Sequence, residues 1–142
     1  MHILLTTCTA AKRTDATPLP AVERYLDPRM DHAVDEAVRH GLRLMIFSGV
    51  FGLLDASDPI PWYDHALAAD EVDAAAEVLA ECLVQEGISA VSALLEGRSG
   101  PGWAPYHDAL AQACVAAGVA LTVWVWDPTV GAVRPDLGAP PP

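Results

Sequence analysis

Short apolar runs alternate along the chain with segments of helical periodicity. The runs over residues 3–9, 42–47, 88–95 and 119–126 are rich in aliphatic and β-branched residues, which is typical of strands. The run at 42–47 is almost continuously apolar, as expected for a strand that is buried on both faces of a parallel sheet. The pattern therefore predicts four strands, most of them parallel.

The segment after residue 27 carries the clearest signals of a helix. Asp27 is a suitable N-cap, Pro28 suits the first helical position, and Gly41 suits the C-terminal end. Apolar residues recur at helical spacing from Met30 to Val38, which predicts a stripe that packs on a sheet. Two further helices are predicted at residues 70–86 and 105–117.

Strands and helices thus alternate, which indicates an α/β fold. With 142 residues, the chain has room for one ordinary domain. We predict a single α/β domain over residues 1–128, with a mostly parallel central sheet of about four or more strands flanked by helices. Residues 129–142 are rich in proline and glycine and predict an irregular tail.

The ends of the predicted strands carry the most distinctive residues of the chain. In open parallel sheets, ligands bind at the carboxyl ends of the strands. These ends carry Cys8 with Lys12, then Ser48–Asp55, then Glu96–Gly102, and finally Asp127. Lys12 is the single lysine of the chain. We therefore expect these segments to converge on one site.

Composition narrows the classes of function. The net charge of −11 disfavours a nonspecific coat on nucleic acid, because a polyanion would be repelled. The three cysteines form neither a close pair nor a metal-type spacing with the histidines, so we expect no metal. No glycine motif matches a phosphate or dinucleotide loop, so no cofactor is predicted. Without a secretory signal or a long apolar segment, the sequence predicts a cytoplasmic protein that contacts no membrane.

The candidate catalytic residues are Lys12, Tyr63 and Asp64. Lys12 either holds a phosphate or carboxylate, acts as a nucleophile, or is a solvated loop residue. Asp64 either acts as a general base, binds a ligand hydroxyl or caps a helix. Cys8 is either a buried small side chain or part of the ligand site.

The candidate ligand-binding residues surround the second strand end. Ser48 and Gly49 offer a hydroxyl and backbone amides to an oxygen-rich ligand. Phe51 and Trp62, together with Trp103, either stack on a planar ring or belong to the core. In the glycine-rich loop, Arg98 is a second candidate anion clamp, and Glu96 either pairs with Arg98 or acts as an acid. This loop also precedes Tyr106 and His107, which open the last predicted helix.

Three short motifs of the first 67 residues resemble the YaaA-like proteins and related small bacterial proteins of unassigned function. They are Cys8-x-x-x-Lys12, then Ser48-Gly49-x-Phe51-Gly52-Leu53-Leu54, and then Ile60-x-x-Tyr63-Asp64. The family pattern has Tyr or His where this chain has Phe51, and proline where it has Trp62. A ring hydroxyl or imidazole is therefore absent at residue 51.

The resemblance implies an α/β fold similar to uracil-DNA-glycosylase-like domains and chemistry on nucleobases or nucleotides. Together with the acidity of the chain, it predicts an enzyme that acts on a nucleotide-like or other anionic, ring-bearing metabolite, cleaving or transferring at an N-glycosidic or related C–N bond. The alternative implied by the resemblance is a noncatalytic module for nucleic-acid binding or oxidative-stress response. Trp124 and Trp126 lie on one side of a strand, which predicts a possible contact between copies of the chain.

Overall fold

A six-stranded sheet forms the centre of the protein. A computed structural model describes residues 1–135. The sheet has the order β4-β3-β1-β6-β7-β8, and the four inner strands run parallel. The inner strands are β1 (His2–Thr7), β3 (Arg43–Ser48), β6 (Ala90–Glu96) and β7 (Ala120–Asp127). The predicted α/β fold with a mostly parallel sheet is confirmed.

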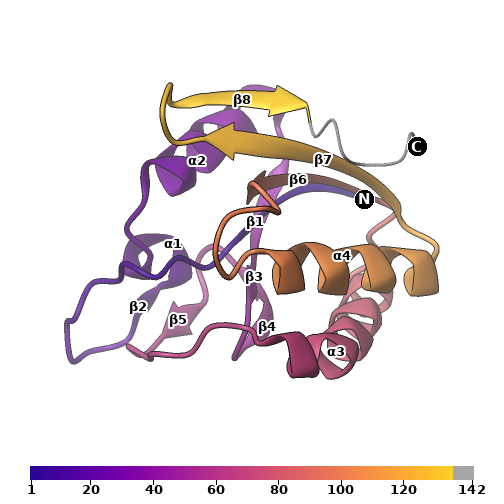
Figure 1. Cartoon of the computed structure of the whole chain (residues 1–142), viewed down its shortest axis with the longest axis horizontal. Helices are drawn as coiled ribbons and strands as arrows, with labels where there is room; N and C mark the ends of the chain where they lie inside the picture. The colour runs from indigo at the N-terminus through magenta and orange to yellow at the C-terminus, as the bar shows by residue number, and fades with distance from the viewer. Residues whose placement is uncertain (136–142) are drawn as a thin grey trace.

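Helices cover both faces of this sheet (Figure 1). Helix α2 (Pro28–His40) lies on one face, and α3 (Val72–Gln85) packs beside α4 (Ala104–Ala117) on the other. Each face has its own buried cluster of apolar side chains. The remaining helical elements are short: α1 (Ala21–Arg24) and the 3₁₀ turn η1 (Ala69–Glu71).

Helix α2 begins and ends as its sequence predicts. The Asp27 carboxylate accepts a hydrogen bond from Arg29 N at 2.8 Å, and Gly41 ends the helix with a φ of 63°. The predicted apolar stripe is wrong at one position, because Val38 is 79% exposed. Met30 and Ala37 of the predicted stripe are buried, and Arg29 and Ala33 share the buried face with them. An arginine therefore lies on the side of α2 that faces the sheet.

Both edges of the sheet carry antiparallel strands that the sequence pattern does not predict. In the segment Ser48–Asp55, which follows the second predicted strand, Gly52–Asp55 turns back along β3 as strand β4. The prediction of an irregular tail is wrong for Ala132–Pro135, which pairs with β7 as strand β8. Residues 136–142 of the predicted tail lie outside the described residues. A separate two-stranded sheet joins β2 (Leu19–Pro20) to β5 (Pro59–Ile60).

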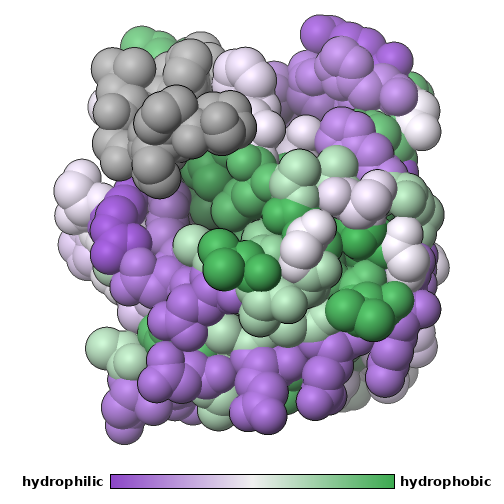
Figure 2. All heavy atoms as spheres, turned by 90° about the vertical axis from the view of Figure 1, so that its right-hand side faces the viewer, coloured by the Kyte–Doolittle hydropathy of each residue, from purple (hydrophilic) through white to green (hydrophobic). Residues whose placement is uncertain are grey.

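The order of the strands defines where a ligand crevice is expected. Strands β1 and β6 are neighbours, but the chain leaves β1 toward α2 on one face and leaves β6 toward α4 on the other (Figure 1). In open α/β sheets, ligands bind beside the carboxyl ends of such a pair of strands. This end of the sheet is on the left in Figure 1. Figure 2 shows the opposite end of the molecule, where hydrophobic side chains gather above a hydrophilic lower border.

Candidate functional site

Cys8 joins the end of β1 to helix α4. It follows the last residue of β1, and its backbone N–H donates to Phe47 O of the neighbouring strand at 3.0 Å. Its Sγ lies 3.3 Å from Tyr106 Oη, to which it donates. Tyr106 Oη also accepts a hydrogen bond from Leu67 N at 3.0 Å. Cys8 is therefore buried as a contact between elements, in agreement with the first of its two predicted roles.

Ser48 closes the turn between β3 and β4. Its Oγ accepts hydrogen bonds from Val50 N at 3.2 Å and from Phe51 N at 3.1 Å. The same Oγ lies 2.9 Å from Tyr63 Oη. Gly49 follows Ser48 in a crowded position, where a Cβ atom would lie 3.0 Å from Leu67 N. The turn thus depends on the hydroxyl of Ser48 and on a residue without a side chain, Gly49, at the next position.

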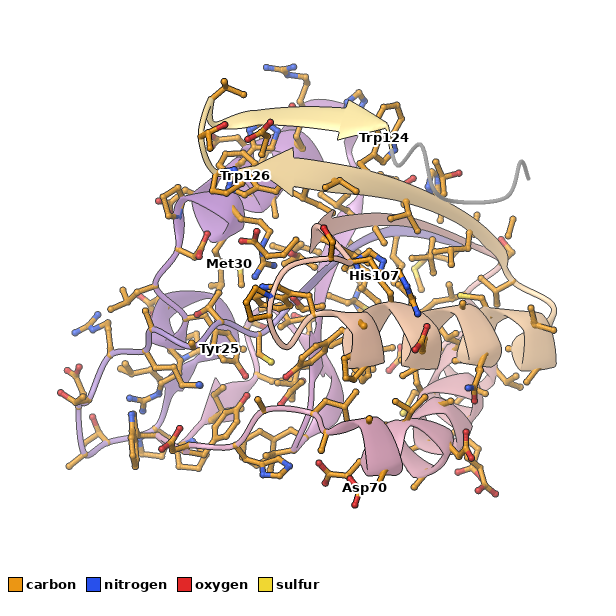
Figure 3. The ribbon with its side chains drawn as sticks, in the orientation of Figure 1. Tyr25, Met30, Asp70, His107, Trp124 and Trp126 are labelled. Carbon is orange, nitrogen blue, oxygen red and sulfur yellow. The ribbon has the colours of Figure 1, made fainter. Side chains whose placement is uncertain are left out.

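Three aromatic rings meet beside this turn. Tyr63 Oη lies 2.6 Å from Tyr25 Oη, and the two rings are nearly perpendicular with centroids 6.3 Å apart. Phe51 contacts Tyr63 edge to face at 5.1 Å. In Figure 3, Tyr25 lies at the left-hand end of the molecule, where β1 ends. We call Lys12, Tyr25, Ser48, Phe51 and Tyr63 the tyrosine cluster.

Lys12 brings a positive charge to these rings. Its backbone forms an isolated antiparallel bridge with Tyr25. Its Nζ lies 4.7 Å from the ring centroid of Tyr63 and 6.0 Å from that of Tyr25, within the range of a cation–π contact. No ion pair to Lys12 is found within residues 1–135. The ammonium group is therefore held by aromatic faces rather than by an acid.

Arg24 holds the loop that carries Lys12. Its fully buried guanidinium donates to the carbonyl oxygens of Arg13 at 2.6 Å, of Asp15 at 3.1 Å and of Thr17 at 2.9 Å. It also donates to Ile60 O at 3.2 Å, three residues before Tyr63. One side chain thus ties the Lys12 loop to the segment that supplies Tyr63.

A second buried arginine lies at the ends of β1 and β6. Arg29 donates to Thr6 Oγ1 at 2.5 Å and to Cys8 O at 3.4 Å, and its Nε lies 3.3 Å from Glu96 Oε1. Its guanidinium is 5.2 Å from the Trp103 ring centroid. Burial lowers the pKa of Arg29 while Glu96 acts to raise it, but a guanidinium stays charged in proteins. Glu96 therefore pairs with Arg29, and the predicted pairing of Glu96 with Arg98 is wrong.

The electrostatics of the site keep its phenols neutral. Burial is the main cause that raises the pKa of each of the three tyrosines above its ordinary value. The pKa of Tyr25 rises to about 12. Those of Tyr63 and Tyr106 also rise, and the sulfur of Cys8 adds to the effect. All three hydroxyl groups therefore keep their hydrogens at neutral pH.

The structure brings together six of the predicted site residues at the ends of β1 and β3. These are Cys8, Lys12, Ser48, Gly49, Phe51 and Tyr63. Gly52 begins β4 beside them with a φ of 71°. Glu96 lies at the neighbouring end of β6, bound to Arg29.

Other predicted residues lie outside this group. Asp64 and Trp62 are exposed, and neither has a hydrogen bond or ring contact with another described residue. Asp64 does not cap a helix, because the following 3₁₀ turn starts at Ala69. Arg98 forms an exposed ion pair with Asp108. Asp55 is carried away from the site by β4 and pairs with Arg43 at the start of β3.

Sequence reasoning misses Arg24, Tyr25 and Arg29 as parts of the site. The sequence does carry a signal for Arg29. It precedes Ala33 by four residues and Ala37 by eight, so all three lie on the face of α2 that packs on the sheet. Arg24 and Tyr25 follow the short strand β2 and carry no periodic pattern. Their positions depend on carbonyl and ring contacts between distant segments, and no local pattern encodes such contacts.

A groove of about 900 Å³ lies elsewhere, between α2 and the strands β1, β6 and β7. Its lining includes His32, His40, Glu36 and Trp124, and no member of the tyrosine cluster. Within residues 1–135, no group of three or more histidines, cysteines or acids is placed to hold a metal ion. The groove is therefore separate from the polar groups that converge at the strand ends.

No helix in the described part of the chain is long and apolar enough to cross a membrane. The chain matches no protein-family model, no curated protein and no solved structure in the three comparisons made.

Proposed function

We propose that the tyrosine cluster is the ligand site of a small-molecule enzyme that acts on a nucleotide-like or other anionic, ring-bearing metabolite. The observation that carries this proposal is the position of Lys12. Its ammonium lies over the Tyr63 ring, and no acid within residues 1–135 forms an ion pair with it. In a chain with 19 acidic and 8 basic residues, a lysine at a strand end without an acidic partner suits an anionic ligand.

Exposed aromatic rings beside this charge suit the ring of such a metabolite. Phe51 is 38% exposed while its ring also contacts Tyr63. Trp62 is 51% exposed and immediately precedes Tyr63 in the chain. Stacking on aromatic faces binds any nucleobase, because every base has a π-face. Phe51 is the better supported of the two, because Tyr63 holds its ring in place.

The proposed reaction is hydrolysis or transfer at an N-glycosidic or related C–N bond. In hydrolysis, a water oxygen bonds to the carbon, the electrons of the C–N bond pass to the nitrogen, and the nitrogen takes up a proton. Asp64 has an exposed carboxylate without a hydrogen-bond partner in the described part of the chain, so it can accept the proton of the attacking water. Neutral Tyr63 can donate a hydrogen bond to the ligand.

The resemblance to YaaA-like proteins supports a shared site without defining its chemistry. The motif positions Cys8, Lys12, Ser48 and Tyr63 all lie within the group at the strand ends. Nucleic-acid binding of the YaaA type is the rival function, and the net charge of −11 counts against it. The free cysteines Cys8, Cys82 and Cys114 are consistent with a reducing compartment, so we propose a cytoplasmic location.

A thermal-shift screen with nucleotides, nucleobases and sugar phosphates tests the proposal. A true ligand raises the melting temperature of the wild type. Lys12→Ala removes this rise, whereas Arg39→Ala, which deletes an equal charge on the surface of α2, retains it. Chromatography of the reaction mixture then detects release of the free base, which Asp64→Asn slows.

The same screen separates the rival function. Binding to DNA that weakens steeply with salt, without any shift from small molecules, would favour a nucleic-acid module. A ligand that stabilises the wild type and Lys12→Ala equally would remove Lys12 from the site.

A further inference from the structure

The hydrogen bonds of Ser48 determine the direction of its own hydroxyl. Its Oγ accepts from Val50 N at 3.2 Å and from Phe51 N at 3.1 Å. A hydroxyl oxygen has two lone pairs, and these contacts occupy both. The hydrogen of Ser48 is therefore donated to Tyr63 Oη, 2.9 Å away.

The two phenols then have one hydroxyl hydrogen that their mutual hydrogen bond does not use. A single hydrogen bond joins Tyr25 Oη to Tyr63 Oη at 2.6 Å, and it consumes one of their two hydrogens. Ser48 cannot accept the other, because it already donates to Tyr63. No further hydrogen bond of either phenol is found within residues 1–135. Whichever phenol donates to the other, one O–H remains without an acceptor among the described residues.

Two basic side chains, Lys12 and Arg24, lie near the tyrosine pair. Lys12 Nζ lies over the ring of Tyr63, 4.7 Å from its centroid. The hydrogen bonds of the buried Arg24 guanidinium all go to neutral carbonyl oxygens. Among the described residues, neither cation forms an ion pair with a carboxylate. The charge of Lys12 is thus not balanced by an ion pair with any of the described residues.

We infer that the ligand presents a terminal anionic oxygen, of a phosphate monoester or a carboxylate, to Lys12 and to one hydroxyl of the Tyr25–Tyr63 pair. This inference rests on the proposed function and specifies which part of the ligand the cluster recognises. The Lys12 ammonium is a donor without acceptor capacity, so a ligand amine or ring N–H finds no acceptor on it. A neutral carbonyl would accept the hydrogen bond but would leave the ammonium charge unbalanced. High phenol pKa values keep the tyrosine hydrogens in place at neutral pH.

Titration calorimetry at low salt with matched probes tests this inference. The probes are uridine with uridine 5′-monophosphate, and adenosine with adenosine 5′-monophosphate. The wild type should bind the phosphorylated member of at least one pair tenfold or more tightly than the nucleoside, because a hydrogen bond to a charged group contributes about 1.5–3 kcal/mol. Lys12→Met should abolish this preference, whereas Lys12→Arg, which keeps the charge, should retain most of it.

Two substitutions that remove the tyrosine hydroxyl groups test whether the pair has a hydrogen to donate to the ligand. Tyr25→Phe and Tyr63→Phe each leave one phenol, which still has a spare hydrogen, so either single variant should lose only a few-fold in affinity for the phosphorylated probe. The double variant has no phenol in the pair and should lose about tenfold or more, beyond the product of the single losses. Ser99→Ala, at an exposed serine of the glycine-rich loop, is the control.

The outcomes separate the inference from the proposed function. The inferred recognition of an anionic oxygen is wrong if the nucleosides bind as tightly as their phosphates, or if Lys12→Met still prefers the phosphorylated probe. Either result leaves the proposed binding of a ring-bearing metabolite intact. If neither member of either pair binds and the wider screen also finds no ligand, both proposals fail. The lysine variants decide the question even if the double tyrosine variant does not fold.

Discussion

The hydroxyl oxygens of Ser48 and Tyr63 lie 2.9 Å apart, although 15 residues separate them in the chain. Ser48 ends β3 and caps the turn into β4, and Tyr63 follows the small sheet formed by β2 and β5. The contact therefore joins the main sheet to the segments that carry Lys12 and Tyr25. A single serine supports both a turn and the candidate site.

Ser48→Ala should destabilise the protein by about 1–3 kcal/mol, because it leaves buried groups without their hydrogen-bond partner. The amides of Val50 and Phe51 lose their acceptor, and Tyr63 loses its donor. Urea unfolding followed by circular dichroism measures the effect. Ser99→Ala, at an exposed position without such contacts, should change stability by less than about 0.5 kcal/mol. Equal effects of the two variants would contradict the role of Ser48.

Gly49→Ala should also be destabilising, for a steric reason. The added Cβ would lie 3.0 Å from Leu67 N and 3.2 Å from Tyr106 Oη, and these two atoms are hydrogen-bonded to each other. We expect a loss of about 1–3 kcal/mol, as for overpacking in a core. Gly97→Ala is the matched control, because its Cβ would meet only Val125 Cγ1 at 3.7 Å. A Gly49→Ala protein as stable as Gly97→Ala would show that the turn relaxes freely.

The sheet and the strand ends are predictable from sequence, because buried parallel strands are short apolar runs and their ends are marked by polar residues. This reasoning correctly locates β1, which Cys8 follows, and β3, which Ser48 ends. The motif spacing also selects Lys12 and Tyr63, which the structure brings into contact. These successes concern residues at the ends of regular elements.

The contacts that complete the site are not predictable in this way. Strand β4 is too short for an alternating pattern, so the sequence does not show that Gly52–Asp55 pairs with β3. The roles of Arg24 and Arg29 arise from partners in distant segments. Burial of a charged side chain is also the rarer outcome for any arginine, so composition argues against both.

Trp124 and Trp126 lie on the same side of β7 but in different surroundings (Figure 3). Trp126 is buried and packs against His32 at 5.3 Å, so the predicted contact between copies through both tryptophans is wrong for this residue. Trp126→Ala should destabilise the protein by about 3–5 kcal/mol in urea unfolding. Trp124 is 41% exposed, and Trp124→Ala should cost much less. If Trp124 does lie between copies, sedimentation will show that its loss dissociates them.

The pair formed by Arg29 and Glu96 should behave as a buried ion pair. Arg29→Met leaves Glu96 and the carbonyl of Cys8 without their donor, and we expect a loss of about 3–5 kcal/mol. Glu96→Gln keeps a hydrogen-bond acceptor and should cost less. The double variant should be more stable than the sum of the single losses predicts, which urea unfolding of all four proteins measures. Arg39→Met, at an exposed ion pair, is the control. Strict additivity would show that the pair contributes little.

The three tyrosines are the only ones in the chain, so their titration can be followed directly by the absorbance of tyrosinate. Burial raises the pKa of Tyr25 from 10.0 to about 12 and raises those of Tyr63 and Tyr106 as well. The unfolded chain therefore releases these protons at lower pH than the folded protein does.

Stability should consequently be constant with respect to these groups below pH 10 and should fall as the pH rises from 10 toward 12. In that window the slope approaches about 1.4 kcal/mol per pH unit for each tyrosine that ionises only on unfolding. Urea unfolding at a series of pH values measures this slope. Tyr25→Phe should reduce the slope by the contribution of one tyrosine. Tyrosinate absorbance of the folded protein should stay low at pH 10 while that of the urea-unfolded chain is half developed. A folded protein whose tyrosines titrate together at pH 10 with no loss of stability would contradict the buried, protonated state of these hydroxyls.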